Sequence, residues 1–329
     1  MGISSIAIIG LGSIGRRHLR LTRELFPDIK IFVVRSGIGE NHPELIFANK
    51  VFYSIDDLLK DGVDAAIISS PTSLHISQAT KLASRGVHLL IEKPLSINSH
   101  GLKEFYNLIN SSKLVIAVGY VLRFHPILQF LKNTLEKDNF SFGKILSVDI
   151  NCASYLPDWR PNYDYKKSVS ALKDLGGGVL LELSHEIDYA IWLFGLPHGV
   201  FAKVNNSGSL GIEVDDQADI IFNNLNYNCS IHLDFNSRLT NRNIKIRSTN
   251  GEVNVDLVKS SFSWMPSFGD NYKKTIEVER DQIYISQILN FIDSISKSKP
   301  IVPLNDAISV MRVIDKINES NRLKKEVEV

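Results

Sequence analysis

The chain has 329 residues, 44% of them hydrophobic, which is enough for two domains that each bury a core. Its 37 lysines and arginines nearly balance its 36 aspartates and glutamates, so we expect neither nucleic acid nor acidic membrane as a partner. Only two cysteines are present, without CxxC spacing, and no run of about 18 apolar residues occurs, so we expect no disulfide framework, metal site or membrane span, and a cytoplasmic location.

The first predicted elements are a strand, a glycine turn and a helix. A short apolar run at residues 6–9 leads directly into the pattern GxGxxG, and residues 16–25 have a helical pattern. In dinucleotide-binding folds the first two glycines permit the turn and the approach of the pyrophosphate, and the third lets the helix pack on the strand. The alternative is an ordinary glycine turn. The cofactor-binding residues expected here are Gly10, Gly12, Ser13, Ile14 and Gly15.

Further apolar or β-rich runs alternate with helical patterns along the first third of the chain. Runs that are apolar throughout are typical of strands buried on both faces of a parallel sheet. The pattern therefore predicts a doubly wound α/β fold. The expected strands are Ile29–Val34, Ala65–Ser69, Val87–Ile91 and Leu114–Val118, and the clearest helices between them are Leu74–Ser84 and Leu102–Ile109.

The residues after the second of these strands bear on the choice of cofactor. An Asp or Glu there would hold the ribose 2′-hydroxyl of NAD, but Val34 is followed by Arg35 and Ser36. A guanidinium and a hydroxyl suit a 2′-phosphate better, because arginine forms paired hydrogen bonds to phosphate. We therefore expect NADP in preference to NAD. The alternative is that Arg35 is a solvated loop residue.

Three loops, at residues 69–75, 92–94 and 119–126, follow predicted strands. Ligands of open α/β sheets bind at the carboxyl ends of strands, so we expect these loops to converge on the nicotinamide end of the cofactor. Lys93 directly follows an apolar strand, where its charge would stabilise a developing alkoxide. The alternative is a salt bridge with Glu92 alone. The loop residues assigned to cofactor or substrate are Ser70, Pro71, His75, Glu92, Lys93 and Arg123.

From residue 143 the pattern changes to shorter strands, and an antiparallel sheet is expected because apolar and polar residues alternate along them. Asn250-Gly251 predicts a hairpin turn. The expected strands are Ile145–Ala153, Val200–Asn206, Ala218–Phe222, Cys229–Phe235, Ile244–Ser248 and Val253–Leu257, and two helices are expected at Gln282–Ser296 and Asn305–Lys316.

A loop rich in aromatic residues, 155–165, follows the first strand of this sheet. Trp159 and Arg160 suit a sugar ring with an acidic group, through stacking and paired hydrogen bonds. The alternative is a folded loop whose aromatic side chains fill the domain junction.

Residues 174–195 form a stretch with three glycines at 176–178 and the period of an amphipathic helix. Consecutive glycines cost on the order of 0.5–1 kcal/mol each inside an element, so we expect a ligand to approach the helix start. His185 suits proton transfer because its unperturbed pKa, about 6.5, lies near working pH. We expect Asp188 or Glu182 to orient its imidazole; the alternative for His185 is a capping or core histidine. The side chains predicted on the polar, substrate-facing side are Glu182, His185, Glu186 and Tyr189.

Four motifs in this order resemble those of the Gfo/Idh/MocA oxidoreductases, and the resemblance spans nearly the whole chain. It implies a Rossmann domain with a doubly wound parallel sheet at residues 1–122. An α+β domain at residues 123–329, built on a large, mostly antiparallel sheet, would bind substrate and form a homodimer or homotetramer. The motifs are Gly10-x-Gly12-x-x-Gly15, Glu92-Lys93-Pro94, Arg123-Phe124-x-Pro126 and the glycine-rich segment leading to His185 and Asp188.

By the same resemblance the chain is an NAD(P)-dependent dehydrogenase or reductase acting on CH–OH groups. Typical members transfer hydride between a nicotinamide and a hydroxyl or keto carbon, so a sugar, sugar acid or nucleotide-sugar is the expected substrate. Lys93 matches the lysine that contacts substrate and nicotinamide, and His185 matches the histidine that serves as acid or base. The family usually has an Asp four residues before that histidine. Here that position is Leu181, and Glu182 is the expected substitute.

The aromatic loop and the segment Leu-Ser-His-Glu-Ile-Asp also resemble a subgroup linked to bacterial surface-carbohydrate synthesis. Two other functions stay open: a dinucleotide-binding sensor without turnover, and an NAD-dependent glycosidase that keeps its cofactor bound. The presence of both Lys93 and His185 argues against the sensor, since pure binding does not need them.

Overall fold

The computed structural model describes residues 2–37, 42–110, 112–137, 141–297 and 300–329. The chain divides into two compact units, one formed by residues 1–121 with 280–308 and the other by residues 122–279 with 309–329. None of the helices in the described ranges combines the length and the apolar character needed to cross a bilayer.

The first unit is a parallel sheet with the strand order β3-β2-β1-β4-β5-β6. This is the order of a doubly wound dinucleotide-binding sheet, and it confirms the predicted fold. The strand order reverses between β1 and β4, which is where such sheets bind ligands. The strands are β1 (Ser5–Ile9), β2 (Lys30–Val34), β3 (Lys50–Phe52), β4 (Ala65–Ile68), β5 (His88–Ile91) and β6 (Ile116–Val118). The helices are α1 (Ser13–Leu25), α2 (Ile55–Asp61), α3 (His75–Ala83), α4 (Leu102–Asn110) and α8 (Gln282–Lys297).

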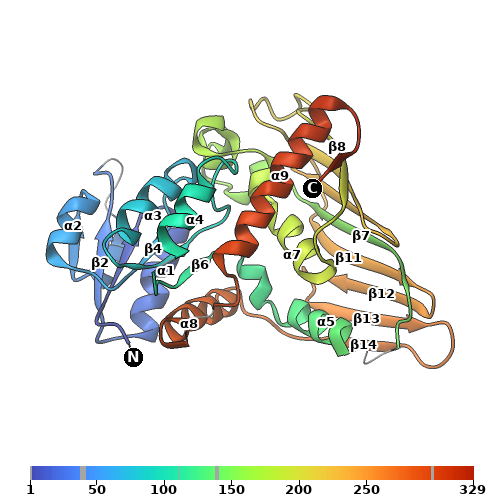
Figure 1. Cartoon of the computed structure of the whole chain (residues 1–329), viewed down its shortest axis with the longest axis horizontal. Helices are drawn as coiled ribbons and strands as arrows, with labels where there is room; N and C mark the ends of the chain where they lie inside the picture. The colour runs from blue at the N-terminus through green and yellow to red at the C-terminus, as the bar shows by residue number, and fades with distance from the viewer. Residues whose placement is uncertain (1, 38–41, 111, 138–140, 298–299) are drawn as a thin grey trace. The chain divides into compact units, whose positions relative to one another are not determined.

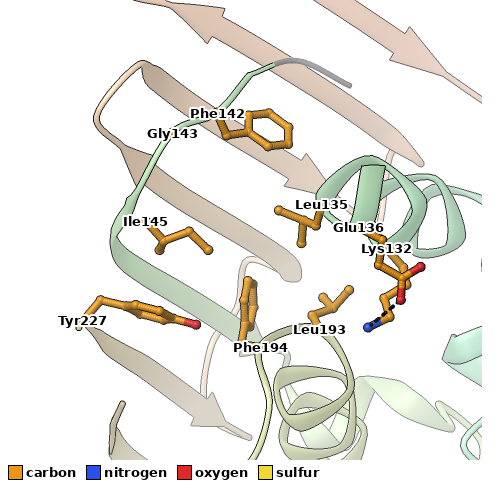
Figure 2. Close-up of a pocket in the computed structure, with 9 residues that line it drawn as sticks. All are labelled: Lys132, Leu135, Glu136, Phe142, Gly143, Ile145, Leu193, Phe194 and Tyr227. Carbon is orange, nitrogen blue, oxygen red and sulfur yellow. Dashed lines mark ion pairs between the residues drawn. The ribbon is translucent and has the colours of Figure 1, made fainter. Parts of the chain in front are cut away.

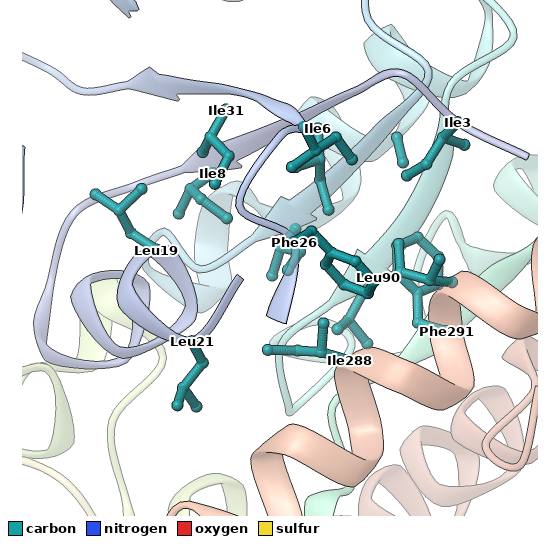
Figure 3. Close-up of a cluster of buried hydrophobic side chains, with 14 of the residues drawn as sticks. Ile3, Ile6, Ile8, Leu19, Leu21, Phe26, Ile31, Leu90, Ile288 and Phe291 are labelled. Atoms are coloured by element: carbon teal, nitrogen blue, oxygen red, sulfur yellow. The ribbon is translucent and has the colours of Figure 1, made fainter. Parts of the chain in front are cut away.

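Helix α8 joins the first unit from the far end of the chain. It packs beside α1 (Figure 1), and Ile288 and Phe291 enter the cluster of buried side chains built on β1 and β5 (Figure 3). The predicted boundary placed residues 280–308 in the second domain, whereas the structure groups them with the first unit. Burial of the apolar side of α8 against this core explains the difference.

The second unit is a sheet with the order β14-β13-β12-β11-β7-β10-β9-β8-β15. Its pairs are antiparallel except for β7 with β10, which confirms the predicted mostly antiparallel sheet. Ser248 pairs with Gly251 across the predicted hairpin turn. The strands are β7 (Ile145–Ala153), β8 (Gly199–Asn205), β9 (Gln217–Asn223), β10 (Asn228–Asp234), β11 (Asn241–Ser248), β12 (Gly251–Asp256), β13 (Ser261–Pro266), β14 (Tyr272–Thr275) and β15 (Val327–Glu328).

Helices cover one face of this sheet. α7 packs on β7 and β10, α6 on β9 and β10, and α5 on β13 (Figure 1). The last part of α9 is joined to the edge strand β8, because Ser320 and Asn321 accept hydrogen bonds from backbone N–H groups of that strand. Every second side chain of β9 and β10 is buried on the covered face, so the alternation fixes the register. These helices are α5 (Pro126–Lys137), α6 (Val179–Glu182), α7 (Ser184–Phe194) and α9 (Leu304–Leu323).

Candidate active site

The glycine turn between β1 and α1 needs each of its three glycines for a different reason. A Cβ at Gly10, whose φ is +91°, would lie 2.7 Å from the backbone nitrogen of Ser70. A Cβ at Gly15 would lie 2.1 Å from the carbonyl oxygen of Gly10. At Gly12, by contrast, a Cβ would meet nothing within 4 Å in the described structure. Gly10 and Gly15 are therefore required by the fold, whereas Gly12 leaves space for a ligand.

The start of α1 is suited to bind an anion. Gly12 precedes the helix and offers no side chain to cap it, so the N–H groups at Ser13, Ile14 and Gly15 are not capped by that residue. The helix dipole adds partial positive charge at this end, and there is no acidic residue in the first turn. An uncapped helix start beside an open glycine fits the pyrophosphate of a dinucleotide.

The residues expected to choose the cofactor follow β2. Arg35 is half-buried and its backbone N–H donates to the carbonyl of Phe52, while Ser36 is exposed. No carboxylate side chain occupies positions 35–37. Arg35 and Ser36, the residues that favour a 2′-phosphate, thus follow the strand at whose end the dinucleotide fold holds the ribose.

Hydrogen bonds join the loops that follow β4 and β5. The buried His75 has Nε2 2.9 Å from the carbonyl oxygen of Ser70 and Nδ1 2.9 Å from that of Pro94. Burial lowers the pKa of His75 although both carbonyl contacts act to raise it. The Oγ of Ser70 donates to Gln78, and Pro71 is half-buried. His75 therefore connects the two loops through its ring nitrogens.

Lys93 follows β5 as predicted and is half-buried. The adjacent Glu92 is buried, and its Oε1 lies 2.7 Å from Nε2 of His18 on α1. This contact was not predicted, because residues 18 and 92 come together only when the sheet forms. A cofactor contact by Glu92 stays a prediction.

The glycine-led stretch of the second unit differs from its prediction. It is not one continuous helix: α6 ends at Glu182, and Leu183, with φ −97° and ψ 26°, separates it from α7. The glycines before it fit against protein atoms. A Cβ at Gly177 would lie 2.6 Å from the carbonyl oxygen of Val169, and one at Gly178 would lie 2.5 Å from Oδ1 of Asp215. The expectation that these glycines make room for a ligand is therefore wrong for Gly177 and Gly178, which are needed because other parts of the protein pack closely against them.

Asp215 binds the start of α6. Its carboxylate accepts a hydrogen bond from the backbone of Leu180 at 3.0 Å, and its carbonyl accepts one from Val179 at 2.9 Å. Burial raises the pKa of this carboxyl, opposed by the backbone hydrogen bonds. Asp215 thus takes the place of a side-chain cap and fixes the short helix that carries Glu182.

His185 and Glu182 lie at the junction of α6 and α7, and both are half-buried. Oε1 of Glu182 accepts a hydrogen bond from Ser170 at 3.0 Å. Asp215, which binds the start of α6, lies just before β9. The junction therefore lies at the end of the sheet where β7 and β10 finish. The predicted acid-base candidate is thus accessible at the same sheet end as the aromatic loop.

Arg123 and Asp188 form an ion pair inside the second unit. Nε of Arg123 donates to Oδ2 of Asp188 at 3.0 Å and Nη2 donates to Oδ1 at 2.7 Å, and both residues are 1% exposed. The guanidinium carbon also lies 5.5 Å from the ring centre of Trp192. The pair joins the residues after β6 to α7. Roles in substrate binding and in orienting His185 stay predictions for these two residues.

Two side chains predicted to face the substrate are buried instead. Glu186 accepts a hydrogen bond from Nε of Arg242 at 2.8 Å and lies 3.3 Å from the hydroxyl of Tyr189, and both Glu186 and Tyr189 are 0% exposed. The polar side of the helix therefore faces β11 at these positions. Helical periodicity could not show that these side chains are buried, because the partner Arg242 lies 56 residues after Glu186.

The aromatic loop contains the expected exposed groups. Trp159 is 38% exposed, donates to the hydroxyl of Ser154 and packs edge-on against Phe235, and Arg160 is exposed. Arg238, which was not predicted, also contacts this loop: its guanidinium carbon lies 3.5 Å from the ring centre of Tyr155. Position 238 follows a predicted strand at the same sheet end, which is the only sequence signal that could have identified it.

A separate pocket of about 340 Å³ opens at the other end of α7. Figure 2 shows Leu135, Leu193 and Phe194 pointing into it, with an ion pair between Lys132 and Glu136 at its side. Helix α7 rises about 1.5 Å per residue, so this pocket is about 10 Å or more from His185 along the axis. It does not contain the predicted catalytic groups.

No group of three or more His, Cys, Asp or Glu side chains in the described part of the chain is arranged to hold a metal ion.

Comparison with known proteins identifies both units. Residues 4–120 match the model of the oxidoreductase family with NAD-binding Rossmann fold, and residues 137–254 match the GFO/IDH/MocA C-terminal domain. The chain is similar to levoglucosan dehydrogenase in complex with NADH, with a TM-score of 0.85 at 19% identity, covering 99% of this chain and 98% of that one. At this identity the similarity shows the fold.

The curated relatives with named activities include a dehydrogenase and a hydratase. UDP-N-acetylglucosamine 3-dehydrogenase of Acidithiobacillus ferrooxidans is 31% identical, over 44% of this chain and 48% of that protein. The 2,7-anhydro-N-acetylneuraminate hydratase of Mediterraneibacter gnavus is 24% identical, over 76% of this chain and 67% of that protein. The matched part of the chain spans between 48% and 57% of the length of three curated relatives, two of which have no named activity.

Proposed function

Because the chain belongs to the Gfo/Idh/MocA oxidoreductase family, we propose that it is an NAD(P)-dependent dehydrogenase or reductase acting on a sugar derivative. The uncapped start of α1 beside the open Gly12 is the observation that supports this most strongly, since it fits a dinucleotide pyrophosphate. The bound cofactor would supply or accept the hydride at its nicotinamide ring.

Residues of the first unit would bind that cofactor. The backbone from Gly10 to Gly15 would hold the pyrophosphate, and the loops after β4 and β5, with Ser70 and Pro71, would border the nicotinamide. We propose NADP as the preferred form, because Arg35 and Ser36 stand where NAD-specific folds place a carboxylate. NAD is the second choice.

We assign His185 the transfer of the hydroxyl proton and Lys93 the stabilisation of charge on the reacting oxygen. Glu182 is the better partner for the imidazole. It is half-buried at the same helix junction, whereas both carboxylate oxygens of Asp188 already accept hydrogen bonds from Arg123. Glu182 would then take the role of the family's aspartate. That aspartate's position is Leu181 in this chain, and Glu182 is one residue closer to the histidine.

We propose an acidic sugar derivative, such as a sugar acid or nucleotide-sugar, as the substrate. Arg160 and Arg238 are both exposed, and no carboxylate in the described residues pairs with either guanidinium. Trp159, which precedes Arg160 in the chain, offers a partly exposed ring for a sugar face. Two relatives are named for compounds of this kind, UDP-N-acetylglucosamine and 2,7-anhydro-N-acetylneuraminate, whereas two others are named for the uncharged D-xylose and scyllo-inositol.

A second candidate is a reaction without net oxidation, in which the cofactor stays bound through the cycle, as in an NAD-dependent glycosidase. The relative named as a hydratase supports this alternative. An absorbance spectrum of the purified protein distinguishes the two. Retained dinucleotide and products at the substrate's oxidation level favour the second candidate, and stoichiometric change in reduced cofactor favours the dehydrogenase.

The function is tested by screening sugars, sugar acids and nucleotide-sugars for a change in reduced-cofactor absorbance, followed by His185→Ala and Lys93→Ala. Each substitution is expected to lower kcat about 10²- to 10⁴-fold, and in His185→Ala cofactor binding, followed by fluorescence, should remain. Lys137→Ala, at the end of α5, is the matched control and should leave kcat unchanged. Full activity in His185→Ala would contradict the assignment.

We further propose a homodimer or homotetramer formed through the sheet of the second unit, and a cytoplasmic location. The first proposal is supported by Phe201 and Ile221, which are exposed among polar side chains on the uncovered face of that sheet. The second is supported by the two cysteines, which are both free and buried. Light scattering during gel filtration measures the oligomeric state, and a monomer at micromolar concentration would contradict the first of these proposals.

A further inference from the structure

The buried pair of His18 and Glu92 lies between the predicted phosphate-binding helix and the predicted catalytic lysine. His18 is in the second turn of α1 and is 0% exposed, and Glu92 directly follows β5 and is 7% exposed. Nε2 of His18 lies 2.7 Å from Oε1 of Glu92. The other carboxylate oxygen, Oε2, accepts a hydrogen bond at 3.2 Å from the backbone N–H of Lys93. The carboxylate of Glu92 thus connects α1 to the backbone of Lys93.

The contact assigns the donor of the pair. Nδ1 of His18 is buried and has no hydrogen-bond partner among the described residues. A carboxylate oxygen accepts, so the hydrogen bond to Oε1 of Glu92 needs a proton on Nε2 of His18. We therefore assign His18 as the side-chain donor to the Glu92 carboxylate. Loss of this donor would leave a buried carboxylate without its side-chain partner.

Neighbouring backbone and side chains pack closely around the pair. A Cβ at Gly119 would lie 2.8 Å from Oε2 of Glu92, so the backbone after β6 closes one side. On the other side the ring of Tyr284, on α8, packs edge-on against His18 with a 6.0 Å centroid distance. Arg17 lies 4.7 Å above that tyrosine ring and pairs with Asp281 at 3.2 Å. The pair is enclosed by α1, β6 and α8.

We propose that His18 is a positioning residue of the reaction: through Glu92 it fixes the backbone segment from which Lys93 projects. This rests on the role of Lys93 in the proposed function. The helix that holds the cofactor phosphates also carries His18, about one turn beyond Gly15. The placement of the cofactor and that of Lys93 are therefore set by one element.

The test compares His18→Leu, His18→Gln and Leu21→Ala in the full-length protein. Leucine removes the donor, whereas the side-chain amide of glutamine can replace it. Leu21 is buried in the same helix without a hydrogen bond to Glu92, so Leu21→Ala controls for loss of stability alone. His18→Leu is expected to lower kcat about 10- to 100-fold, as for a slightly misplaced catalytic group, while His18→Gln restores kcat to within about 3-fold of wild type. Leu21→Ala should lower the melting temperature without changing kcat.

A readout that does not depend on turnover accompanies the kinetics. After reductive ¹³C-methylation, the Lys93 methyl resonance, identified by its loss in Lys93→Arg, is expected to shift in His18→Leu but not in His18→Gln or Leu21→Ala. An unchanged Lys93 resonance in His18→Leu, or kcat values equal to those of Leu21→Ala, would overturn the proposal. If the wild type oxidises or reduces no sugar, the proposed function fails, and the resonance alone decides the role of His18.

Discussion

The helix that carries His185 is held by buried charges on the residues that follow. Glu186 is paired with Arg242 on β11, and Asp188 is paired with Arg123. Breaking a fully buried pair such as Arg123–Asp188 costs about 3–5 kcal/mol, because the remaining charge is left uncompensated. The loss is smaller for Glu186–Arg242, since the side chain of Arg242 is 25% exposed. The pairs therefore resist rotation of α7, and a fixed rotation keeps His185 at the accessible end of the helix.

His125, close to this charge cluster, is expected to make stability depend on pH. It is 5% exposed, and its Nδ1 accepts the backbone N–H of Ile127 at 3.2 Å, which requires a neutral ring. Burial, with a smaller contribution from the charge of Arg242, lowers the pKa of His125 to about 4. The unfolded chain takes up this proton near pH 6.5 and the folded chain near pH 4. Stability should therefore be complete above about pH 6.5 and fall, by on the order of 3 kcal/mol, as the pH decreases toward 4.

Urea unfolding followed by tryptophan fluorescence measures this, since Trp159, Trp192 and Trp264 all belong to the second unit, as does His125. The pKa of His75 is also lowered by burial, so the wild-type slope alone is not sufficient. The comparison is with His125→Gln, which should lose stability less steeply between pH 6.5 and 4. Identical slopes in the two proteins would contradict the prediction.

At the scale of elements, the glycine turn allows fold and cofactor binding to be separated by two similar substitutions. Gly15→Ala places a methyl group 2.1 Å from the carbonyl oxygen of Gly10 and should cost about 1–3 kcal/mol or more of stability. Gly12→Ala meets no atom within 4 Å, and its φ of −69° is open to alanine. It should leave stability within about 1 kcal/mol of wild type and yet weaken NADPH binding about 10-fold or more, a loss of about 1.4 kcal/mol.

Thermal unfolding followed by circular dichroism and NADPH titration followed by fluorescence measure the two effects. Wild-type affinity in Gly12→Ala would show that no cofactor approaches this residue. A stable Gly15→Ala protein would show that α1 can move away from β1 without cost.

The elements differ in how far local sequence could predict them. The strand, glycine turn and helix at the start of the chain were predictable, because apolar runs and glycines there act on neighbouring residues. The break at Leu183 and the burial of Glu186 were not, since they depend on Asp215 and Arg242, which are distant in sequence. Helical periodicity identifies a polar side but not whether a buried partner or solvent faces it. Lys93 and His185 were predictable as candidates, whereas His18 as the partner of Glu92 required the folded sheet.

At the scale of the whole molecule, the chain returns to its first unit at residues 280–308, between two segments of the second unit. Helix α8 lies about 160 residues after β6, and it packs on α1 and on the strands that lead to the glycine turn. The amphipathic pattern of residues 282–296 predicted a helix but could not indicate which core it joins. Hydrophobic contact with β1 and β5 decides this, and such contacts carry no local signal in the sequence.

Phe291 tests whether α8 is part of the first core. It is 1% exposed within the cluster of Figure 3, whereas Leu289, two residues earlier, is 44% exposed. Phe291→Ala removes a large buried side chain and should cost about 3–5 kcal/mol, while Leu289→Ala should change stability by less than about 0.5 kcal/mol. Chemical unfolding followed by far-ultraviolet circular dichroism measures both. Equal effects would mean that α8 does not contribute its buried side to this core. With Tyr284 of the same helix packed against His18, the larger loss would also show that residues 280–308 are needed to complete the core of the cofactor-binding unit.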